Sequence, residues 1–181
     1  MSEEMIVRHC SPTLAGLKTG NLFRCSYESK ERLRAEICSL NRKLAAKGLC
    51  ILPLAVREKD ALIYVYRPSR LKADLSCKEA GSILEQHGYC CRQPAKCVSH
   101  LRLRLQEQEE FPHEIGLFLG YPPEDVRGFI QKETPKYVGH WKVYGDAEKA
   151  QRLFAQYKKC TDANIRKLTA GSSLERLTVA V

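Results

Sequence analysis

The order of apolar and polar residues along the chain predicts helices and strands in mixed order. In several stretches apolar residues recur every three or four positions, which places them on one face of a helix. Ser29 and Gly48 are typical of a helix start and a helix end, so we expect a helix over residues 30–47. Ser76 and Glu79 have capping-box spacing and predict a second helix that stops at Gly88.

Further helices are expected over residues 94–110, on both sides of residues 120–123, and in a long stretch after Asp146. Strands are expected where apolar runs are short or alternate. They cover residues 7–13, where Pro12 ends the run, residues 50–56 and 61–66, which form a hairpin, and residues 137–144.

This mixed order predicts an α+β fold: a single compact domain over residues 1–181, with helices packed on a small mixed β-sheet of about four or five strands. The chain has 181 residues, of which 44% are hydrophobic and 28% charged, and this composition excludes disordered, collagen-like and coiled-coil classes. Apolar runs such as residues 50–56 are too short to span a bilayer, and residues 1–5 lack a secretory pattern. We therefore expect a cytoplasmic protein that does not enter membranes.

The nine cysteines do not indicate disulfides or a metal site. Their number is odd, and no two have the Cys-x-x-Cys spacing that holds a tetrahedral metal. Free thiols fit a reducing cytosol. The sequence predicts no metal ligands and identifies no cofactor.

The net charge of +9 is concentrated in one half of the chain. Residues 30–104 contain 16 Lys and Arg against 7 Asp and Glu, a surplus of nine that accounts for the whole charge. Such a positive field attracts nucleic acid, anionic metabolites or an acidic protein partner. A solvated basic surface that only keeps the protein soluble explains it equally well.

Three segments, residues 9–18, 111–126 and 139–146, combine side chains that are costly to keep for packing alone. If a strand ends near Pro12, Cys10 and Ser11 lie beside a helix N-terminus, which binds anions and activates thiols. The candidate catalytic residues are Cys10, His113 and Glu114. The candidate ligand-binding residues are His9, Ser11, Thr13, Lys18, Tyr121, His140, Trp141, Lys142 and Asp146.

Other motifs lack a required residue or carry charges that argue against their usual function. A zinc protease needs a second histidine four positions after His113, and residue 117 is Leu. Residues 115–130 have the spacing of a helix-turn-helix, but the second helix starts with Glu124 and Asp125, which would repel phosphates. The chain contains neither a Gly-x-Gly-x-x-Gly nor a Gly-Lys-Ser/Thr phosphate-binding motif.

The same three segments carry a family resemblance. Residues 9–23, 111–130 and 140–161, and most of all the phrase HEIGLFLGYP, resemble the bacterial family called domain of unknown function 3793. This resemblance implies a single-domain protein of similar length from an anaerobic Gram-positive bacterium. It implies no activity, cofactor or catalytic residue.

Our leading hypothesis is a cytoplasmic accessory or binding protein. The three segments would form one pocket for an anionic small molecule, a redox cofactor or a redox protein with an acidic face. The second hypothesis is nucleic-acid binding through residues 30–104. The third is a thiol-dependent enzyme with Cys10 as nucleophile, His113 as base and Glu114 orienting that base. Whether the protein is an enzyme is left open.

Overall fold

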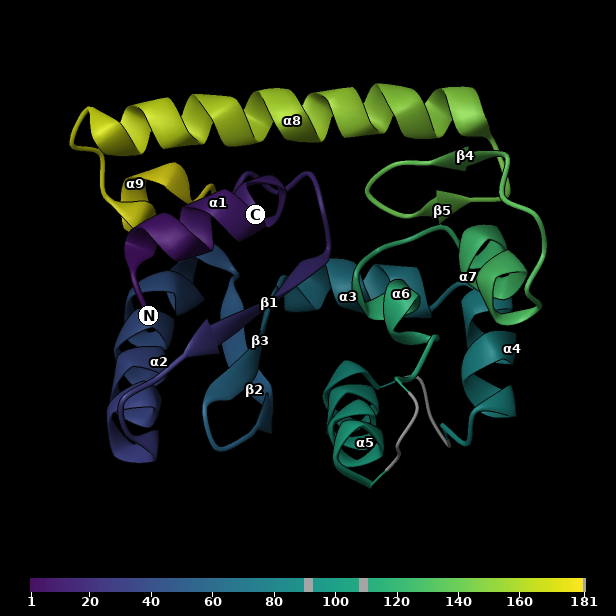
Figure 1. Cartoon of the computed structure of the whole chain (residues 1–181), viewed down its shortest axis with the longest axis horizontal. Coiled ribbons are helices and arrows are strands. Elements are labelled where there is room, and N and C mark those ends of the chain that lie inside the picture. The colour runs from purple at the N-terminus through teal and green to yellow at the C-terminus, as the bar shows by residue number, and fades with distance from the viewer. Residues whose placement is uncertain (90–92, 108–110, 181) are drawn as a thin grey trace. The chain divides into compact units, whose positions relative to one another are not determined.

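Residues 1–69 and 157–181 form one unit of the structure, and residues 70–156 form another. The structure is a computed structural model that describes residues 1–89, 93–107 and 111–180 (Figure 1). Helices and antiparallel strands are both present, so the predicted α+β class is confirmed. The described strands form separate sheets of three and two strands instead of one mixed sheet. The single domain over residues 1–181 stays a prediction.

The first unit, unit 1, contains a three-stranded antiparallel sheet with strand order β1-β3-β2. It also includes the later part of α8 (Ala147–Thr169). Its other elements are α1 (Glu3–Leu14), β1 (Gly20–Ser26), α2 (Lys30–Leu44), the 3-10 helix η1 (Ala45–Lys47), β2 (Cys50–Val56), β3 (Asp60–Tyr66) and α9 (Leu174–Leu177).

One face of this sheet forms the core of unit 1. Phe23 on β1 is paired with Ile63 on β3, and Cys25 with Ala61, so these side chains lie on the same face. They pack in one cluster with buried residues of α1, α2 and α9, among them Leu14. Removing this apolar surface from water stabilises the unit.

The predicted β2–β3 hairpin and the helix after Ser29 are confirmed. The Ser29 side chain accepts a hydrogen bond from the Arg32 backbone N–H, and Gly48 ends the helical segment with a left-handed φ of 70°. Pro53 lies in β2, which is an edge strand, and the register shifts between Pro53 and Ala55. A proline, which donates no backbone hydrogen bond, is tolerated at such a position.

The predicted strand over residues 7–13 is wrong, because these residues belong to α1. The Ser2 side chain accepts the Met5 backbone N–H and starts the helix earlier than expected. Ile6, Cys10 and Leu14 then fall on one buried face at intervals of four residues. Cys10 and Ser11 consequently lie inside a helix and not beside a helix N-terminus.

The second unit, unit 2, is mainly helical and includes the first part of α8. Its other elements are α3 (Pro68–Leu75), which starts in unit 1, α4 (Lys78–Gln86), α5 (Pro94–Glu107), α6 (Ile115–Phe118), α7 (Pro123–Ile130), β4 (Tyr137–Val138) and β5 (Lys142–Val143). The two short helices expected around residues 120–123 are therefore confirmed. Part of the helix expected over residues 94–110, namely residues 108–110, lies outside the described residues.

Two local predictions in unit 2 need correction. Cys77 is the N-cap of α4, and the Ser76 hydroxyl donates to the Lys72 carbonyl at 2.6 Å, so the predicted capping box is not formed. The strand expected over residues 137–144 is a hairpin of two short strands. Its turn is closed by a 3.0 Å hydrogen bond from the Gly139 N–H to the Trp141 carbonyl. The alternating pattern of residues 137–144 alone does not distinguish one strand from a tight hairpin.

Within the described residues, no helix combines the length and the apolar composition needed to cross a bilayer.

Candidate functional site

The polar side chains of residues 9–18 make structural contacts inside unit 1. The Ser11 hydroxyl donates to the Val7 carbonyl at 2.6 Å, and the Thr13 hydroxyl donates to Asn21 Oδ1 at 2.7 Å. The Lys18 ammonium donates to the Gly20 carbonyl at 2.7 Å. His9 is exposed, and its ring stacks on Phe23 with centroids 5.3 Å apart. Each of these groups has a role in holding the fold.

Burial changes the acid–base behaviour of two residues in this segment. Cys10 is 0% exposed, and burial raises the pKa of its thiol well above the usual value. Burial also lowers the pKa of Lys18 to about 8, against a smaller opposing effect of Cys10. A nucleophilic cysteine needs a lowered pKa and access to substrate, so these features do not favour Cys10 as a nucleophile.

Glu114, the candidate orienting residue, is fully buried in unit 2. Its Oε1 accepts a hydrogen bond from the Tyr89 hydroxyl at 3.0 Å and lies 2.9 Å from Arg104 Nε. Burial and this carboxylate raise the pKa of Tyr89. His113 is exposed, and its ring meets Phe129 edge to face, with centroids 4.9 Å apart. The contacts of Glu114 are thus with Tyr89 and Arg104, while His113 faces a cleft.

That cleft, called the aromatic cleft here, has a volume of about 430 Å³ and lies entirely in unit 2. Its walls come from α6, α7, the β4–β5 hairpin and the residues on both sides of α6. They include Phe111, His113, Leu119, Tyr121, Val126, Phe129, His140, Trp141 and Lys142.

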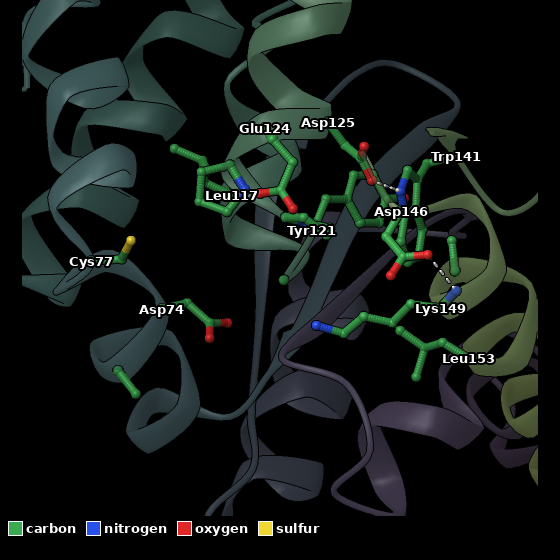
Figure 2. Close-up of a pocket in the computed structure, with 15 residues that line it drawn as sticks. Asp74, Cys77, Leu117, Tyr121, Glu124, Asp125, Trp141, Asp146, Lys149 and Leu153 are labelled. Carbon is green, nitrogen blue, oxygen red and sulfur yellow. Dashed lines mark hydrogen bonds between the residues drawn. The ribbon is translucent and has the colours of Figure 1, made fainter. Parts of the chain in front are cut away.

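A second cleft of about 420 Å³, called the acidic cleft, also lies entirely in unit 2. Its lining comes from α3, α6, α7 and the first turns of α8, together with Cys77 before α4, the loop after α6, Trp141 and Asp146 (Figure 2). Among its residues are Asp74, Cys77, Leu117, Tyr121, Glu124, Asp125, Trp141, Asp146 and Lys149.

Three residues, Tyr121, Asp125 and Trp141, line both clefts. The Tyr121 and Trp141 rings stack with centroids 4.5 Å apart. Asp125 Oδ2 accepts the Trp141 indole N–H at 2.7 Å, and its Oδ1 accepts the backbone N–H groups of Tyr144 and Gly145 at 2.7 and 2.8 Å. This buried carboxylate therefore fixes both the indole ring and the chain entering α8.

Close packing in unit 2 explains two of its glycines. A Cβ at Gly128 would lie 2.5 Å from the Tyr144 ring, and a Cβ at Gly139 would lie 2.3 Å from the Phe154 ring. Phe154 meets the Trp141 ring edge to face at 4.5 Å. Side chains at these two positions would therefore displace the rings that hold the hairpin and Trp141.

The charge available in the aromatic cleft is positive. Its charged residues are Asp125 and Lys142, and Asp125 already accepts three hydrogen bonds. The Lys142 ammonium lies 5.3 Å from the centre of the Phe129 ring. His113 and His140 add two imidazoles. The His140 ring meets Phe154 edge to face at 5.1 Å.

The structure brings together only part of the predicted site. His113, Tyr121, His140, Trp141 and Lys142 all line the aromatic cleft, and Asp146 lines the acidic one. His9, Cys10, Ser11, Thr13 and Lys18 belong to unit 1, and one pocket shared by all three segments stays a prediction.

Sequence reasoning missed several residues of the acidic cleft, among them Asp74, Cys77 and Lys149. They lie on α3 and α8 and at the start of α4, outside the three chosen segments. No local motif marks them. In the described part of the chain, no three His, Cys, Asp or Glu side chains are placed to hold a metal ion.

Fold and clefts together define a small α+β protein with two ligand-sized clefts in its mainly helical unit. The chain belongs to the family described as protein of unknown function (DUF3793), whose model matches residues 6–178. No curated protein and no solved structure matches it.

Proposed function

We propose that this chain is a binding protein that takes up a small aromatic molecule carrying a carboxylate or another anionic group. The observation that carries the proposal is the aromatic cleft, whose walls are largely apolar and whose available charge is the Lys142 ammonium. Ligand sites commonly combine apolar walls with a few polar groups that fix orientation.

Exposed aromatic side chains in the wall of the aromatic cleft support this proposal. Phe111 is 46% exposed and Phe129 is 37% exposed, although both are large and apolar. A ligand that covers them removes apolar surface from water, at roughly 25 cal/mol for each Å² buried. Its anionic group would lie within reach of Lys142 and the two histidines, where a charge-assisted hydrogen bond forms.

The experiment uses three compounds that share one phenylpropyl body and differ in charge: hydrocinnamate, hydrocinnamamide and phenylpropylamine. Binding is measured by titration calorimetry and by the fluorescence of Trp141, the only tryptophan in the chain. We expect hydrocinnamate to bind more tightly than the neutral amide. Lys142→Gln should weaken hydrocinnamate binding roughly tenfold, which corresponds to about 1.4 kcal/mol.

The matched control is Lys72→Gln, which removes the same charge from an exposed position on α3 outside both clefts. Its affinity for hydrocinnamate should equal that of the wild type. Equal binding of acid and amide, or equal affinity of Lys142→Gln and wild type, would show the proposal to be wrong.

The other hypotheses stay predictions. They are a redox cofactor or redox protein partner, nucleic-acid binding through residues 30–104, and thiol chemistry at Cys10. Two arginines of the basic half already pair with carboxylates: Arg32 with Glu28 and Glu36, and Arg104 with Glu114. No contact in the described residues favours these hypotheses over the aromatic cleft.

A further inference from the structure

His113 and Lys142 contact the same aromatic ring in the wall of the aromatic cleft. The imidazole of His113 meets the Phe129 ring edge to face, with centroids 4.9 Å apart. The Lys142 ammonium lies 5.3 Å from the centre of that ring. Phe129 is on α7, which packs beside the β4–β5 hairpin that carries Lys142 (Figure 1). One ring therefore brings together two basic groups from separate segments.

The two basic groups differ in how they respond to pH. Both are exposed and both line the aromatic cleft, so a ligand whose body packs on Phe129 would hold its anionic group near each of them. A lysine ammonium is charged at neutral pH, whereas histidine is the side chain that changes its charge between about pH 5 and about pH 8. The positive charge at this end of the cleft therefore changes with pH through His113.

The charged residues of α7, the helix that His113 contacts, have contacts of their own. Asp125 accepts three hydrogen bonds from the hairpin and the chain after it. Glu124 lines the acidic cleft and not the aromatic one. Arg127 Nη2 lies 3.9 Å from Glu79 Oε2 on α4. The carboxylate of α7 that lines the aromatic cleft is thus already held by N–H donors.

Charged and titratable groups on the neighbouring segments do not cancel the charge of a protonated His113. Glu114, the next residue in the chain, is buried against Tyr89 and Arg104. Lys132 and Glu133, which follow α7, are exposed and opposite in charge. On the hairpin, His140 is a second titratable group in the aromatic cleft and can only add positive charge in acid. Acid should therefore make the cleft more positive.

We propose that His113 makes ligand uptake depend on pH, so that the aromatic cleft binds its anionic ligand more tightly in mild acid than in mild alkali. This inference rests on the proposed function, because it assumes that the aromatic cleft holds the ligand. In acid the anionic group lies near two cations, the Lys142 ammonium and the His113 imidazolium, and in alkali near Lys142 alone. Each cation strengthens binding by Coulomb attraction and a charge-assisted hydrogen bond.

The probe is phenylpropanesulfonate, which keeps the phenylpropyl body and carries a sulfonate that stays ionised at every pH used. Titration calorimetry compares its affinity at about pH 5.5 and about pH 8, on either side of the histidine range. Wild type should bind the sulfonate roughly fivefold more tightly in acid, as one added charge in an exposed site predicts. Neutral hydrocinnamamide should bind equally at both pH values, which controls for any effect of pH on the fold.

Two variants of His113 separate a change of charge from a structural role. His113→Gln keeps a polar side chain that gains no proton, and it should lose most of the increase in acid. His113→Lys carries a permanent charge, so it should bind the sulfonate about as tightly at about pH 8 as the wild type does at about pH 5.5. The matched control is His87→Gln, which removes a half-buried histidine at the end of α4, outside both clefts. This control should keep the pH dependence of the wild type.

Proton uptake gives an independent measurement, because binding and protonation that favour each other are reciprocal. Calorimetry in two buffers of different ionisation enthalpy should show protons taken up when wild type binds the sulfonate, and fewer in His113→Gln. Equal sulfonate affinity of the wild type at both pH values, or an undiminished increase in His113→Gln, would overturn the inference. If binding depends on Lys142 but not on pH, the proposed function stands and only the role of His113 is wrong. If the sulfonate binds no better than the amide at either pH, both fail.

Discussion

The segment of residues 9–18 in unit 1 and the clefts of unit 2 contain similar residue types with opposite exposure. In residues 9–18, four side chains are buried: Cys10, Ser11, Thr13 and Lys18. The last three of these donate hydrogen bonds to nearby residues of unit 1. In unit 2, side chains such as His113, Lys142, Glu124 and Asp146 are exposed around ligand-sized clefts. A polar group that already has a buried partner holds the fold, while an exposed one beside a cavity is available to a ligand.

Among the buried polar side chains of unit 1, substitution of Arg67 should have the largest effect on stability. Its fully buried guanidinium donates to the carbonyls of Thr13 and Leu14 at the end of α1, at 2.7 and 2.6 Å. It also donates to the Lys47 and Val179 carbonyls at 2.9 and 2.7 Å. It thus joins α1, η1 and the C-terminal segment of unit 1.

Arg67→Met should lower the free energy of unfolding of unit 1 by roughly 3–5 kcal/mol, because four carbonyls, those of Thr13 and Leu14 in buried contacts, lose a charged donor. Amide hydrogen exchange of peptides from residues 1–69 measures the loss. The control Arg24→Met removes an exposed arginine that pairs with Asp60, and should change stability by less than about 0.5 kcal/mol. Unchanged exchange in Arg67→Met would mean that this guanidinium does not hold the unit together.

Lys18 should make the next largest contribution to stability, and this contribution depends on pH. Its pKa is about 8 in the folded protein, against 10.5 as the ordinary value. Below pH 8 the Lys18 ammonium is charged in both the folded and the unfolded protein, so burying it destabilises the fold. Between these values the unfolded chain binds more protons, so the free energy of unfolding rises with pH.

The free energy of unfolding of the wild type, relative to that of Lys18→Met, should therefore increase by about 3 kcal/mol between about pH 7 and about pH 11. Urea unfolding followed by circular dichroism at several pH values measures this difference. Subtracting the variant removes the contribution of tyrosines and cysteines that titrate in the same range. Lys43→Met, an exposed lysine on α2, should show no such dependence. A flat difference for Lys18→Met would mean that its ammonium is not penalised by burial.

The sequence predicted the elements that depend on local signals. Ser29 and Gly48 correctly bound the helical segment over residues 30–47, and the β2–β3 hairpin follows from its two apolar runs. Pro12 was misleading because it ended an expected strand, whereas the Ser2 cap and the spacing of Ile6 and Cys10 make a helix. Local periodicity is ambiguous in such short runs.

The sequence predicted the part of the candidate site that is formed by residues close to one another in the chain. The segments around His113 and His140 are close in sequence to the hairpin and short helices that form the aromatic cleft. Asp74 and Lys149 reach the acidic cleft from separate helices. Arg67 directly follows an apolar strand, and its partners lie on three distant segments. Such long-range contacts are set by packing, which one sequence does not reveal.

Asp125 gives the smallest expected change in stability, but it tests the role of the wall shared by the clefts. Asp125→Asn keeps the shape and replaces one accepting oxygen with an NH₂ group, so at least one of the three N–H donors loses its partner. We expect a loss of about 1–3 kcal/mol and a red shift of Trp141 emission, because the indole becomes less firmly held. Affinity for hydrocinnamate should fall, since Tyr121 and Trp141 line the aromatic cleft. The exposed control Glu148→Gln should leave Trp141 emission and the affinity for hydrocinnamate as they are in the wild type. If Asp125→Asn changes neither Trp141 emission nor the affinity for hydrocinnamate, this carboxylate does not hold the cleft wall in place.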